Sequence, residues 1–423
     1  MENYQKTIDY LYSLEYSGIK LGLENVDRLL QFLGNPQKKW PAVHLAGTNG
    51  KGSTAAFIST ILRAAGYKVG LYTSPHLLDF SERIRINEKK IPWETLADYT
   101  RHLKDQIEKQ QATFFEATTA LAFAHFADQK VDIAVIETGL GGRLDATNLV
   151  EPLATIITSI SADHQQFLGD TLPQIAYEKA GIMKSGVPCF TVQQLPEVEQ
   201  VLQEAASEKN IPLFILKPAS HFRIREQNLK GSKFDLLLPQ GSLRNLYIPL
   251  AGTHQVSNAA LAVAAIQALR SFTCSEQYIR GGLLNTSWPG RFQHLADNPL
   301  TILDVAHNPD GFEKVLSFIK EKAPGKNIRA IIGLSKDKDY RKIADIISQH
   351  VSRVGVVASF SSRSLDPEIL SQELVRRAIP TEIFGDINTA YSAFRETTPA
   401  TELLLIIGSH YLAGEFLKKI QIS

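Results

Sequence analysis

Cysteine and long apolar stretches are scarce in this sequence, and each scarcity excludes a class of protein. Only two cysteines, Cys189 and Cys274, occur in 423 residues, and they stand far apart. This spacing gives no disulfide framework and no cysteine metal site, and it favours a reducing compartment. No apolar run approaches the roughly 18 residues that span a bilayer. The opening "MENYQKTIDYLYSLEY" lacks the apolar core of a secretory signal. We therefore expect a cytoplasmic protein without a membrane partner.

Net charge is also nearly absent. The chain has 45 basic and 44 acidic residues, which gives a formal charge of +1. A balanced chain offers no electrostatic reason for a nucleic-acid partner. Hydrophobic residues at 44% and charged residues at 21% are typical of a globular protein. The length suggests about two or three domains. With no spare amphipathic segment in evidence, we expect a monomer.

Strand-like and helix-like segments alternate through the first part of the chain. Apolar runs typical of strands occur at 40–48, 68–74, 131–139, 153–160 and 187–192, and helical patterns lie between them. Such alternation predicts a mostly parallel sheet with helices on both faces. Between Phe222 and Leu250 the pattern changes to short alternating runs with Gly and Pro turns. We interpret this segment as a small antiparallel hairpin appended to the first domain.

The alternation begins again after "NTSWPGRFQ". Five further strand-like runs, at 301–306, 329–334, 353–360, 381–385 and 402–409, are each followed by a helical segment. This order predicts a second, smaller doubly wound domain of the Rossmann type. We place the boundary between Ser287 and Phe292, so the predicted domains are 1–287 and 293–423. The fold class is α/β with two doubly wound domains, and the first is expected to be a phosphate-loop mononucleotide-binding domain.

The stretch "VHLAGTNGKGSTAAFIST" joins a predicted strand to a predicted helix through glycines. Helix N-termini with free N–H groups bind anions, and glycine lets a phosphate approach the backbone closely. The match to the G-x-x-x-x-G-K-[ST] pattern is imperfect, because Leu45 replaces the first glycine and Gly52 separates Lys51 from Ser53. A plain glycine turn is the alternative. We expect a nucleoside triphosphate, with Lys51 on its outer phosphates and Ser53 or Thr54 on Mg²⁺. The nucleotide-binding residues predicted here are Gly47, Thr48, Asn49, Gly50, Lys51, Gly52 and Ser53.

Three candidate metal ligands follow three predicted strands. Glu137 ends one apolar strand, His164 follows the next, and Ser74 ends the strand at 68–74. Ligands gather at the carboxyl ends of strands in open α/β sheets, and a carboxylate after an apolar run is costly to bury without a cation. Oxygen ligands with one imidazole suit Mg²⁺ or Mn²⁺ better than zinc. An ordinary loop histidine and a capping hydroxyl are the alternatives for His164 and Ser74.

Eight motifs together resemble one family. They are "AGTNGKGS", "YTSPHLLDFSERIRIN", "ETGLGGRLDATN", "DHQQFLGDTLPQIAYEKAGIMK", "GTHQVSNAALA", "WPGRF", "DVAHNPDG" and "GLSKDKD". In this order they resemble the folylpolyglutamate synthase and dihydrofolate synthase enzymes of the Mur ligase superfamily. The resemblance covers nearly the whole chain. Mur-type peptidoglycan ligases carry an additional N-terminal domain, for which the early phosphate loop leaves no room.

The resemblance implies an ATP- and Mg²⁺-dependent amide ligase. A substrate carboxylate would attack the γ-phosphate of ATP, and the amino group of L-glutamate would then displace phosphate from the acyl phosphate. Two anions meet in such a reaction, so cations must screen them. The implied acceptor is dihydropteroate, a folate, or both. Another Mur-type amino-acid ligase and a nucleotide-binding switch ATPase are the alternatives.

The resemblance also implies roles for the metal residues. Ser74 and Glu137 would hold one Mg²⁺, and Glu137 and His164 would serve a second. Lys184, in "EKAGIMK", is matched to a family lysine that carries a CO₂ adduct and becomes an anionic oxygen ligand. Such an adduct forms on a neutral amine, so burial or a nearby cation must favour it. An ordinary lysine near a helix C-terminus is the alternative.

The second predicted domain is implied to complete the nucleotide and glutamate sites. In "TILDVAHNPDG", Asp304 would contact the ribose or adenine and His307 would lie near the phosphates. Asn258 and Arg291 match positions that contact the nucleotide from the first domain and the linker. Val305 stands where the family usually has glycine. An Asp–His helix cap and a linker salt bridge are the alternatives for Asp304 and Arg291.

The pterin side of the site rests on three residues. Phe115 would stack on a pterin ring, Asp145 would pair with its N–H groups, and Arg83 would hold a substrate carboxylate. A core aromatic at helical spacing is the alternative for Phe115.

The alternative of a switch ATPase would need a basic or apolar stripe that faces a partner, and the sequence shows neither.

Overall fold

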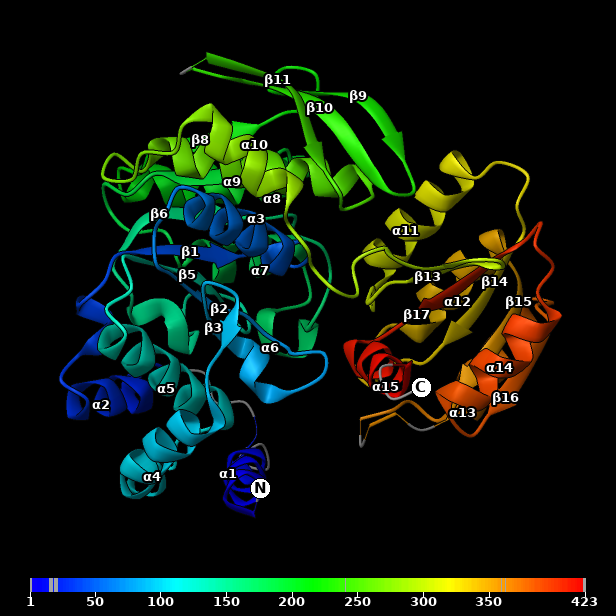
Figure 1. Cartoon of the computed structure of the whole chain (residues 1–423), viewed down its shortest axis with the longest axis horizontal. Coiled ribbons are helices and arrows are strands. Elements are labelled where there is room, and N and C mark those ends of the chain that lie inside the picture. The colour runs from blue at the N-terminus through cyan, green and yellow to red at the C-terminus, as the bar shows by residue number, and fades with distance from the viewer. Residues whose placement is uncertain are drawn as a thin grey trace.

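The computed structural model describes residues 2–14, 18, 22–239, 241–358, 360–361 and 363–420. These residues form two α/β bodies that lie side by side, with a small third sheet attached to the first body (Figure 1). Both bodies have the predicted doubly wound α/β architecture. Residue 1 and residues 421–423, the outer ends of the predicted domain ranges, lie outside the described residues.

The first body is built on an eight-stranded sheet with the order β4-β3-β2-β5-β1-β6-β7-β8. The six strands from β2 to β8 in this order run parallel, and only β3 and β4 pair antiparallel. The five predicted strands are confirmed, whereas the short β3, β4 and β8 were not predicted. The bounds are β1 Ala42–Ala46, β2 Val69–Tyr72, β3 Ile84–Ile86, β4 Lys89–Lys90, β5 Ile133–Glu137, β6 Pro152–Ile157, β7 Cys189–Val192 and β8 Leu213–Leu216.

Helices cover both faces of this sheet. Strand β1 alternates between them: Val43 and Leu45 belong to the apolar cluster with α3 and α9, and Ala42 belongs to the cluster with α2, α4 and α5. The bounds of the helices are α1 Glu2–Ser13, α2 Glu24–Phe32, η2 Pro36–Lys38, α3 Lys51–Ala64, η3 Phe80–Arg83, α4 Trp93–Gln110, α5 Phe114–Asp128, η4 Ala146–Leu149, α6 Gln165–Leu168, α7 Leu172–Ala180, α8 Pro196–Glu208, α9 Thr253–Ala268 and α10 Glu276–Leu284.

The predicted hairpin appendage is a three-stranded antiparallel sheet with the order β11-β10-β9. Its strands are β9 Phe222–Asn228, β10 Gly231–Leu238 and β11 Gly241–Ile248. The predicted hairpin has two strands, whereas the structure has three, because Gly231 and Gly241 each begin a new strand. Buried side chains such as Phe234 and Leu236 join the α3–α9 cluster, so the appendage shares a core with the first body.

The second body contains a six-stranded sheet with the order β12-β13-β17-β14-β15-β16. The five predicted strands are present and parallel, and the partly exposed β12 adds an antiparallel edge that was not predicted. Helices α11–α13 pack with one apolar cluster, and α14 and α15 pack with another. The bounds are β12 Gln293–Asp297, β13 Leu300–Leu303, α11 Pro309–Lys322, β14 Ile328–Ile332, α12 Tyr340–His350, β15 Val351–Val357, α13 Pro367–Arg376, β16 Thr381–Phe384, α14 Ile387–Thr397, β17 Leu403–Ile407 and α15 His410–Ile420.

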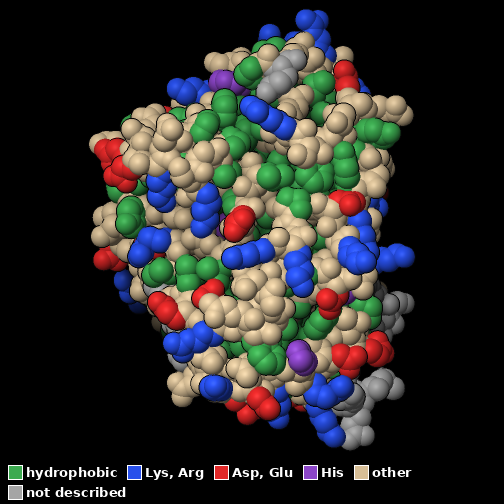
Figure 2. Space-filling view, turned by 90° about the vertical axis from the view of Figure 1, so that its left-hand side faces the viewer, with side chains coloured by type: hydrophobic (Ala, Val, Ile, Leu, Met, Phe, Trp, Pro, Cys, Tyr) green, Lys and Arg blue, Asp and Glu red, His purple; other side chains and the backbone are tan. Residues whose placement is uncertain are grey.

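The surface shows no extended field of one charge on the face that Figure 2 displays. Basic and acidic side chains are interspersed there among polar and apolar atoms. Within the described residues, no helix combines the length and the apolar character that crossing a bilayer requires.

Candidate active site

The phosphate loop, residues 47–53, connects β1 to α3 in the middle of the first sheet. Gly47 and Gly50 have positive φ angles of 148° and 97°. A Cβ at Gly47 would lie 1.8 Å from Thr158 Oγ1, and one at Gly50 would lie 2.5 Å from Asn258 Oδ1. Only glycine fits both positions without displacing a neighbour. The loop therefore forms a backbone cradle at the N-terminus of α3, where anions bind favourably.

Lys51 bends over this cradle. Its Nζ donates to the carbonyl oxygens of Gly47 at 3.0 Å and Thr48 at 3.3 Å, and it lies 4.0 Å from Glu137 Oε1. Ser53 is 1% exposed, and the buried Thr54 Oγ1 has no hydrogen-bond partner among the described residues. A lysine head beside hydroxyls and a helix N-terminus fits the triphosphate that the sequence predicts.

Glu137 is the last residue of β5 and is 5% exposed. Burial raises the pKa of its carboxyl group, whereas Lys51 and the Ser74 N–H, which donates to Oε2 at 3.2 Å, oppose this rise. A divalent cation would stabilise the ionised form in the same way, because carboxylate and hydroxyl oxygens are hard ligands. The structure thus brings together Lys51, Ser74 and Glu137, and the oxygens of Ser74 and Glu137 fit Mg²⁺.

His164 is less closely tied to this group. It follows β6 with a positive φ of 52°, and its Nε2 lies 3.9 Å from Asp163 Oδ1. Desolvation lowers the pKa of His164, which favours the neutral imidazole that can bind a metal. Among the described residues, no three His, Cys, Asp or Glu side chains form a metal site. A cation here would therefore also need hydroxyl, phosphate or water ligands.

The two lysines of "EKAGIMK" occupy different environments. Lys184 Nζ donates to the carbonyl oxygen of Asn148 at 3.0 Å, and no described contact joins it to Ser74, Glu137 or His164. Lys179, which the sequence did not single out, is 4% exposed and donates to Gly47 O of the phosphate loop at 2.9 Å. Burial, and then the nearby Lys51, lower the pKa of Lys179 to about 7. No sequence pattern distinguished Lys179, because lysines are common in helices.

Residues from α9, from the linker and from the second body reach the same region. The Asn258 side chain lies against Gly50, as the close approach of its Oδ1 shows. Arg291 lies close enough to Glu137 and Asp304 to feel both charges, and its buried Nε has no partner among the described residues. Asp304 is used differently: its carboxylate accepts N–H groups from Phe292 at 2.8 Å and Ala306 at 2.7 Å. One oxygen of Asp304 thus fixes the linker to the second sheet, and the other fixes the loop that follows β13.

An ion cluster that the sequence did not predict joins the two bodies. Asp163, after β6, accepts from Lys338 Nζ at 2.7 Å, from Asn308 Nδ2 at 3.2 Å, and lies 3.4 Å from His307 Nε2. The side chains of Asp163 and Lys338 are both 8% exposed. Burial opposes ionisation, but His307, His164 and Lys338 together hold the pKa of Asp163 far below its usual range. Asp163 begins the motif "DHQQFLGDTLPQIAYEKAGIMK" and Lys338 lies in "GLSKDKD", and these motifs were the only sequence signal for the cluster.

The phosphate loop itself contacts the second body. Asn49 Nδ2 donates to Asp310 Oδ2 at 2.8 Å and to Asn308 Oδ1 at 3.2 Å, and Asn308 Nδ2 donates back to Asn49 Oδ1 at 3.1 Å. Asn308 also caps α11 by accepting the Gly311 N–H at 2.9 Å. Figure 1 shows α11 and α15 on the side of the second body that faces the first. The phosphate loop and the N-terminal end of α11 are therefore in direct hydrogen-bond contact.

Two of the three predicted pterin residues, Phe115 and Asp145, contact the loop after β5, and Arg83 lies in η3. Phe115 covers Gly139, where a Cβ would lie 2.5 Å from Phe115 Cζ. The guanidinium of Arg83, 7% exposed, donates to His76 Nδ1 at 2.9 Å and has no acidic partner among the described residues. Asp145 accepts N–H groups from Gly139 at 2.9 Å and Leu140 at 2.8 Å. Asp145 thus fixes the loop, and its contact with a pterin stays a prediction.

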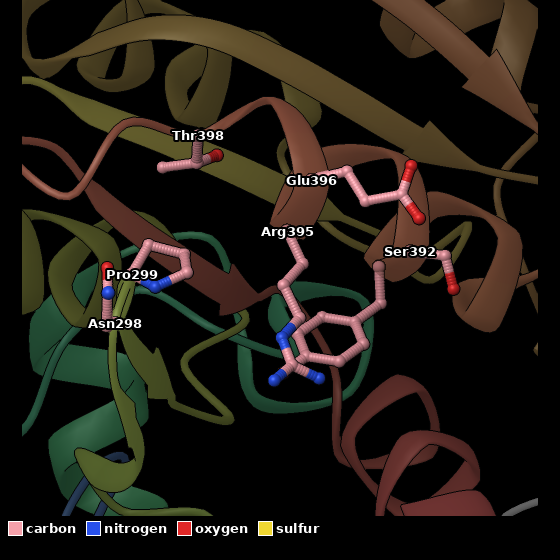
Figure 3. A pocket seen from close by; sticks show the side chains of 7 residues that line it. Asn298, Pro299, Ser392, Arg395, Glu396 and Thr398 are labelled. Atoms are coloured by element: carbon pink, nitrogen blue, oxygen red, sulfur yellow. The ribbon is translucent and has the colours of Figure 1, made fainter.

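Two surface hollows lie away from these residues. One, of about 470 Å³, opens between the β12–β13 turn and α14, where Figure 3 shows Asn298 and Pro299 opposite Arg395 and Glu396. The other lies along α6 and α7 and is lined by residues such as Phe167 and Tyr177. Neither lining contains a residue predicted for the nucleotide, the metal or the pterin.

Known proteins resemble this chain over its full length. The Mur ligase middle domain matches residues 45–266, and the Mur ligase, glutamate ligase domain matches residues 290–410. A dihydrofolate synthase/folylpolyglutamate synthase of Bacillus subtilis is 36% identical over 99% of both chains. The folylpolyglutamate synthase of Thermotoga maritima superposes with a TM-score of 0.85 at 35% identity and covers 99% of this chain and 98% of its own. Escherichia coli FolC in complex with DHPP and ADP gives 0.87 at 31% identity over 98% of both chains. The chain therefore belongs to the Mur ligase family, among its folylpolyglutamate synthase/dihydrofolate synthase members.

Proposed function

We propose that this chain is an ATP-dependent ligase that joins L-glutamate to dihydropteroate, to the glutamate tail of folates, or to both. The observation that carries the proposal is the contact between Lys51 and Glu137, 4.0 Å apart, beside the phosphate loop. Family membership supplies the reaction class. A cation-rich anion site next to one buried carboxylate suits a reaction that brings a carboxylate to a triphosphate.

The residues of the chain would act in a fixed order. The cradle and Lys51 bind and orient the triphosphate, while Arg83 supplies a buried positive charge for an acceptor carboxylate. The acceptor carboxylate attacks the γ-phosphorus, ADP leaves, and an acyl phosphate forms. The amine of L-glutamate then attacks the acyl carbon, and phosphate leaves. Mg²⁺, held by Ser74 and Glu137 with His164 as the candidate for a second ion, would screen the negative charges.

The second body would complete the site by closing over it. His307, from the second body, lies against Asp163 of the first, with 3.4 Å between Nε2 and Oδ2. Arg291 brings a second guanidinium between the bodies, with a buried Nε that has no protein partner among the described residues. A bound nucleotide could accept from that atom, which supports the predicted nucleotide role of Arg291. Asp304 supports the site indirectly, because it fixes the linker that carries Arg291.

We further propose that a CO₂ adduct, if one forms, forms on Lys179 rather than on Lys184. Carbamylation joins the neutral amine nitrogen to the carbon of CO₂ and releases one proton. A pKa of about 7 leaves a large neutral fraction of Lys179 at neutral pH. Lys179 also contacts the phosphate loop, whereas Lys184 contacts Asn148.

We propose two units, 1–287 and 293–423, in a monomeric and cytoplasmic enzyme. Two separate sheets, with β12 beginning at Gln293, support the boundary. Gel filtration with light scattering would test the monomer, and a mass corresponding to two chains would contradict it.

The decisive experiment measures ADP release with ATP, Mg²⁺ and L-glutamate, and it compares dihydropteroate with tetrahydrofolate as acceptor. Mass spectrometry of the products should show one added glutamate. Turnover with both acceptors would establish both activities, and turnover with one would assign the enzyme to that activity. If the rate of ATP hydrolysis depends on neither acceptor and not on glutamate, the ligase proposal is overturned and a nucleotide switch is favoured.

A further inference from the structure

The linker between the two bodies begins at a tryptophan that lies on the phosphate-loop helix. Trp288 packs against the α3–α9 core, and Gly52 lies beneath its indole ring. A Cβ at Gly52 would stand 3.1 Å from Trp288 Nε1 and 3.3 Å from Cζ2. These distances are shorter than ordinary van der Waals contact, so an alanine would push the ring away. The guanidinium of Arg85 lies 5.4 Å from the same ring, a cation–π contact.

This contact explains the residue that interrupts the phosphate-loop pattern. Gly52 separates Lys51 from Ser53, where the general pattern has no insertion. Gly52 lies in α3 and does not have a positive φ angle, so backbone strain does not require glycine there. The space that its missing side chain leaves is occupied by Trp288.

The linker is fixed to the second body only two residues later. Gly290 O accepts the Val305 N–H at 2.9 Å, and a Cβ at Gly290, which has a φ of 74°, would lie 2.8 Å from Val305 Cγ1. The Phe292 N–H then donates to Asp304 at 2.8 Å. Pro289 alone separates the anchor on the first body from the anchors on the second. Arg291 lies inside this short segment.

We propose that Trp288 is a positioning residue, which seats the linker on the phosphate-loop helix and thereby holds Arg291 between Glu137 and Asp304. The inference rests on the proposed function, in that Arg291 is taken to contact the nucleotide. Its action is indirect: Trp288 sets where the linker starts, and the linker sets where the guanidinium points. Because a small misplacement of a binding group is costly, loosening this anchor weakens nucleotide binding.

The test compares Trp288→Ala, Trp288→Phe, Gly52→Ala and the double variant Gly52→Ala/Trp288→Ala. We expect Trp288→Ala to raise the Kd for ADP and the KM for ATP about tenfold, with a smaller change in kcat. Trp288→Phe should restore most of the affinity, because a ring remains on Gly52. Gly52→Ala should weaken binding in the same direction. Trp93→Phe, a tryptophan change in α4, is the matched control and should leave both constants unchanged.

The double variant separates a direct from an indirect effect of Gly52. If Gly52 acts through Trp288, the double variant binds ADP no more weakly than Trp288→Ala alone. If the increases in Kd of the two single variants multiply in the double variant, Gly52 acts on the phosphates by itself. That result overturns the explanation that Gly52 is needed to make room for Trp288. An unchanged Kd in Trp288→Ala overturns the positioning role.

Fluorescence gives a readout that does not depend on turnover or on the folding of Trp288→Ala. Acrylamide quenching of Trp288, taken as the difference from Trp288→Phe, should be weak in the wild type and stronger in Gly52→Ala. Equal quenching in both proteins would overturn the contact. ADP binding measured by calorimetry keeps this test separate from the ligase proposal, because an absent ligase activity would leave the Kd comparison intact.

Discussion

Single side chains in this site owe their chemistry to burial. Glu137 is a carboxylate with 5% exposure, and its nearest basic group, Lys51, stays 4.0 Å away. Arg83 is a guanidinium with 7% exposure and no acidic partner among the described residues. Isolated charges of this kind are costly to the fold, so they are expected where a ligand supplies the opposite charge.

Glu137→Gln keeps the size of the side chain and removes the charge that would bind Mg²⁺. We expect acceptor-dependent ADP release to fall by at least about 100-fold, with partial recovery at high Mg²⁺. The matched control is Glu116→Gln, another buried glutamate, whose carboxylate caps α5 by accepting the Thr113 N–H at 2.7 Å. This control should lower stability by about 1 kcal/mol and leave turnover near the wild-type value. Equal losses of turnover in the two variants would contradict the metal role.

Lys179 and Lys184 provide a second comparison between side chains. With bicarbonate present, peptide mass spectrometry under mild conditions should find the mass of CO₂ on Lys179 and not on Lys184. Lys179→Ala should abolish turnover, because it removes the group beneath Gly47 O. Lys184→Ala should retain turnover. An adduct on Lys184, or full activity of Lys179→Ala, would reverse the assignment.

The sequence identified those side chains whose motif also fixes their place in the fold. Glu137 ends β5, while Lys51 and Ser74 follow β1 and β2 by a few residues, and parallel strands bring their carboxyl ends to one edge. Lys179 lies in α7, and Lys338 lies in a loop of the second body. No local sequence pattern relates either lysine to the phosphate loop. Asp304 was identified, but its use by the linker depends on the Phe292 N–H, which sequence alone cannot place.

Among the elements, β1 joins the phosphate loop to the core. Its one polar residue, His44, is 0% exposed, and its Nε2 lies 2.8 Å from Thr147 Oγ1. Burial, followed by the charge of Lys184, lowers the pKa of His44 from 6.5 to about 3. The native strand therefore holds a neutral imidazole that an unfolded chain would protonate at mildly acidic pH.

This difference predicts acid sensitivity. Between pH 6.5 and about 3 the unfolded chain binds a proton at His44 that the native chain does not. Stability is thus fully present above pH 6.5 and falls as pH decreases through this window, by up to about 1.4 kcal/mol per pH unit. The thermal midpoint of His44→Gln should decrease less between pH 7 and pH 5 than that of the wild type. The control is His102→Gln, which changes an exposed histidine and should show the same dependence of the thermal midpoint on pH as the wild type. If His44→Gln also shows the wild-type dependence, the prediction is wrong.

Elements with a strong apolar period were predicted, and those without one were not. Strands β1, β5 and β17 are buried along their whole length, and their runs were clear in the sequence. Strand β12 has the mixed sequence QHLAD and is partly exposed along most of its length. Strand β8 is a run of only four apolar residues, LFIL, at the half-buried edge of its sheet. The third strand of the appendage was missed because its boundary depends on one glycine, Gly241, within a polar stretch.

At the scale of the whole molecule, the ion pair between Asp163 and Lys338 joins the bodies across their interface. Both side chains are 8% exposed, so the pair is far less screened than a surface pair. Removing one partner leaves a buried charge uncompensated, which usually costs about 3 to 5 kcal/mol. The arrangement of the two bodies should therefore depend on this contact.

Lys338→Ala should loosen the two bodies, which small-angle scattering would detect as a larger radius of gyration. We also expect faster proteolysis within residues 287–292. The control is Lys314→Ala, which removes an ion pair with Asp310 within α11, whose lysine is 35% exposed. A radius that changes equally in both variants, or in neither, would contradict the interface role of Lys338.

The distribution of the site over both sides of the linker has a consequence for dividing the gene. The phosphate cradle and Glu137 come from the first sheet, whereas His307 and Lys338 come from the second, and Asn49 and Asp163 already bind residues of the second body. Two polypeptides cut between Ser287 and Gln293 would each keep their own sheet and core, yet each would lack half of the catalytic groups. Co-expression of the two halves should therefore restore growth to a cell that lacks the enzyme, whereas either half alone should not.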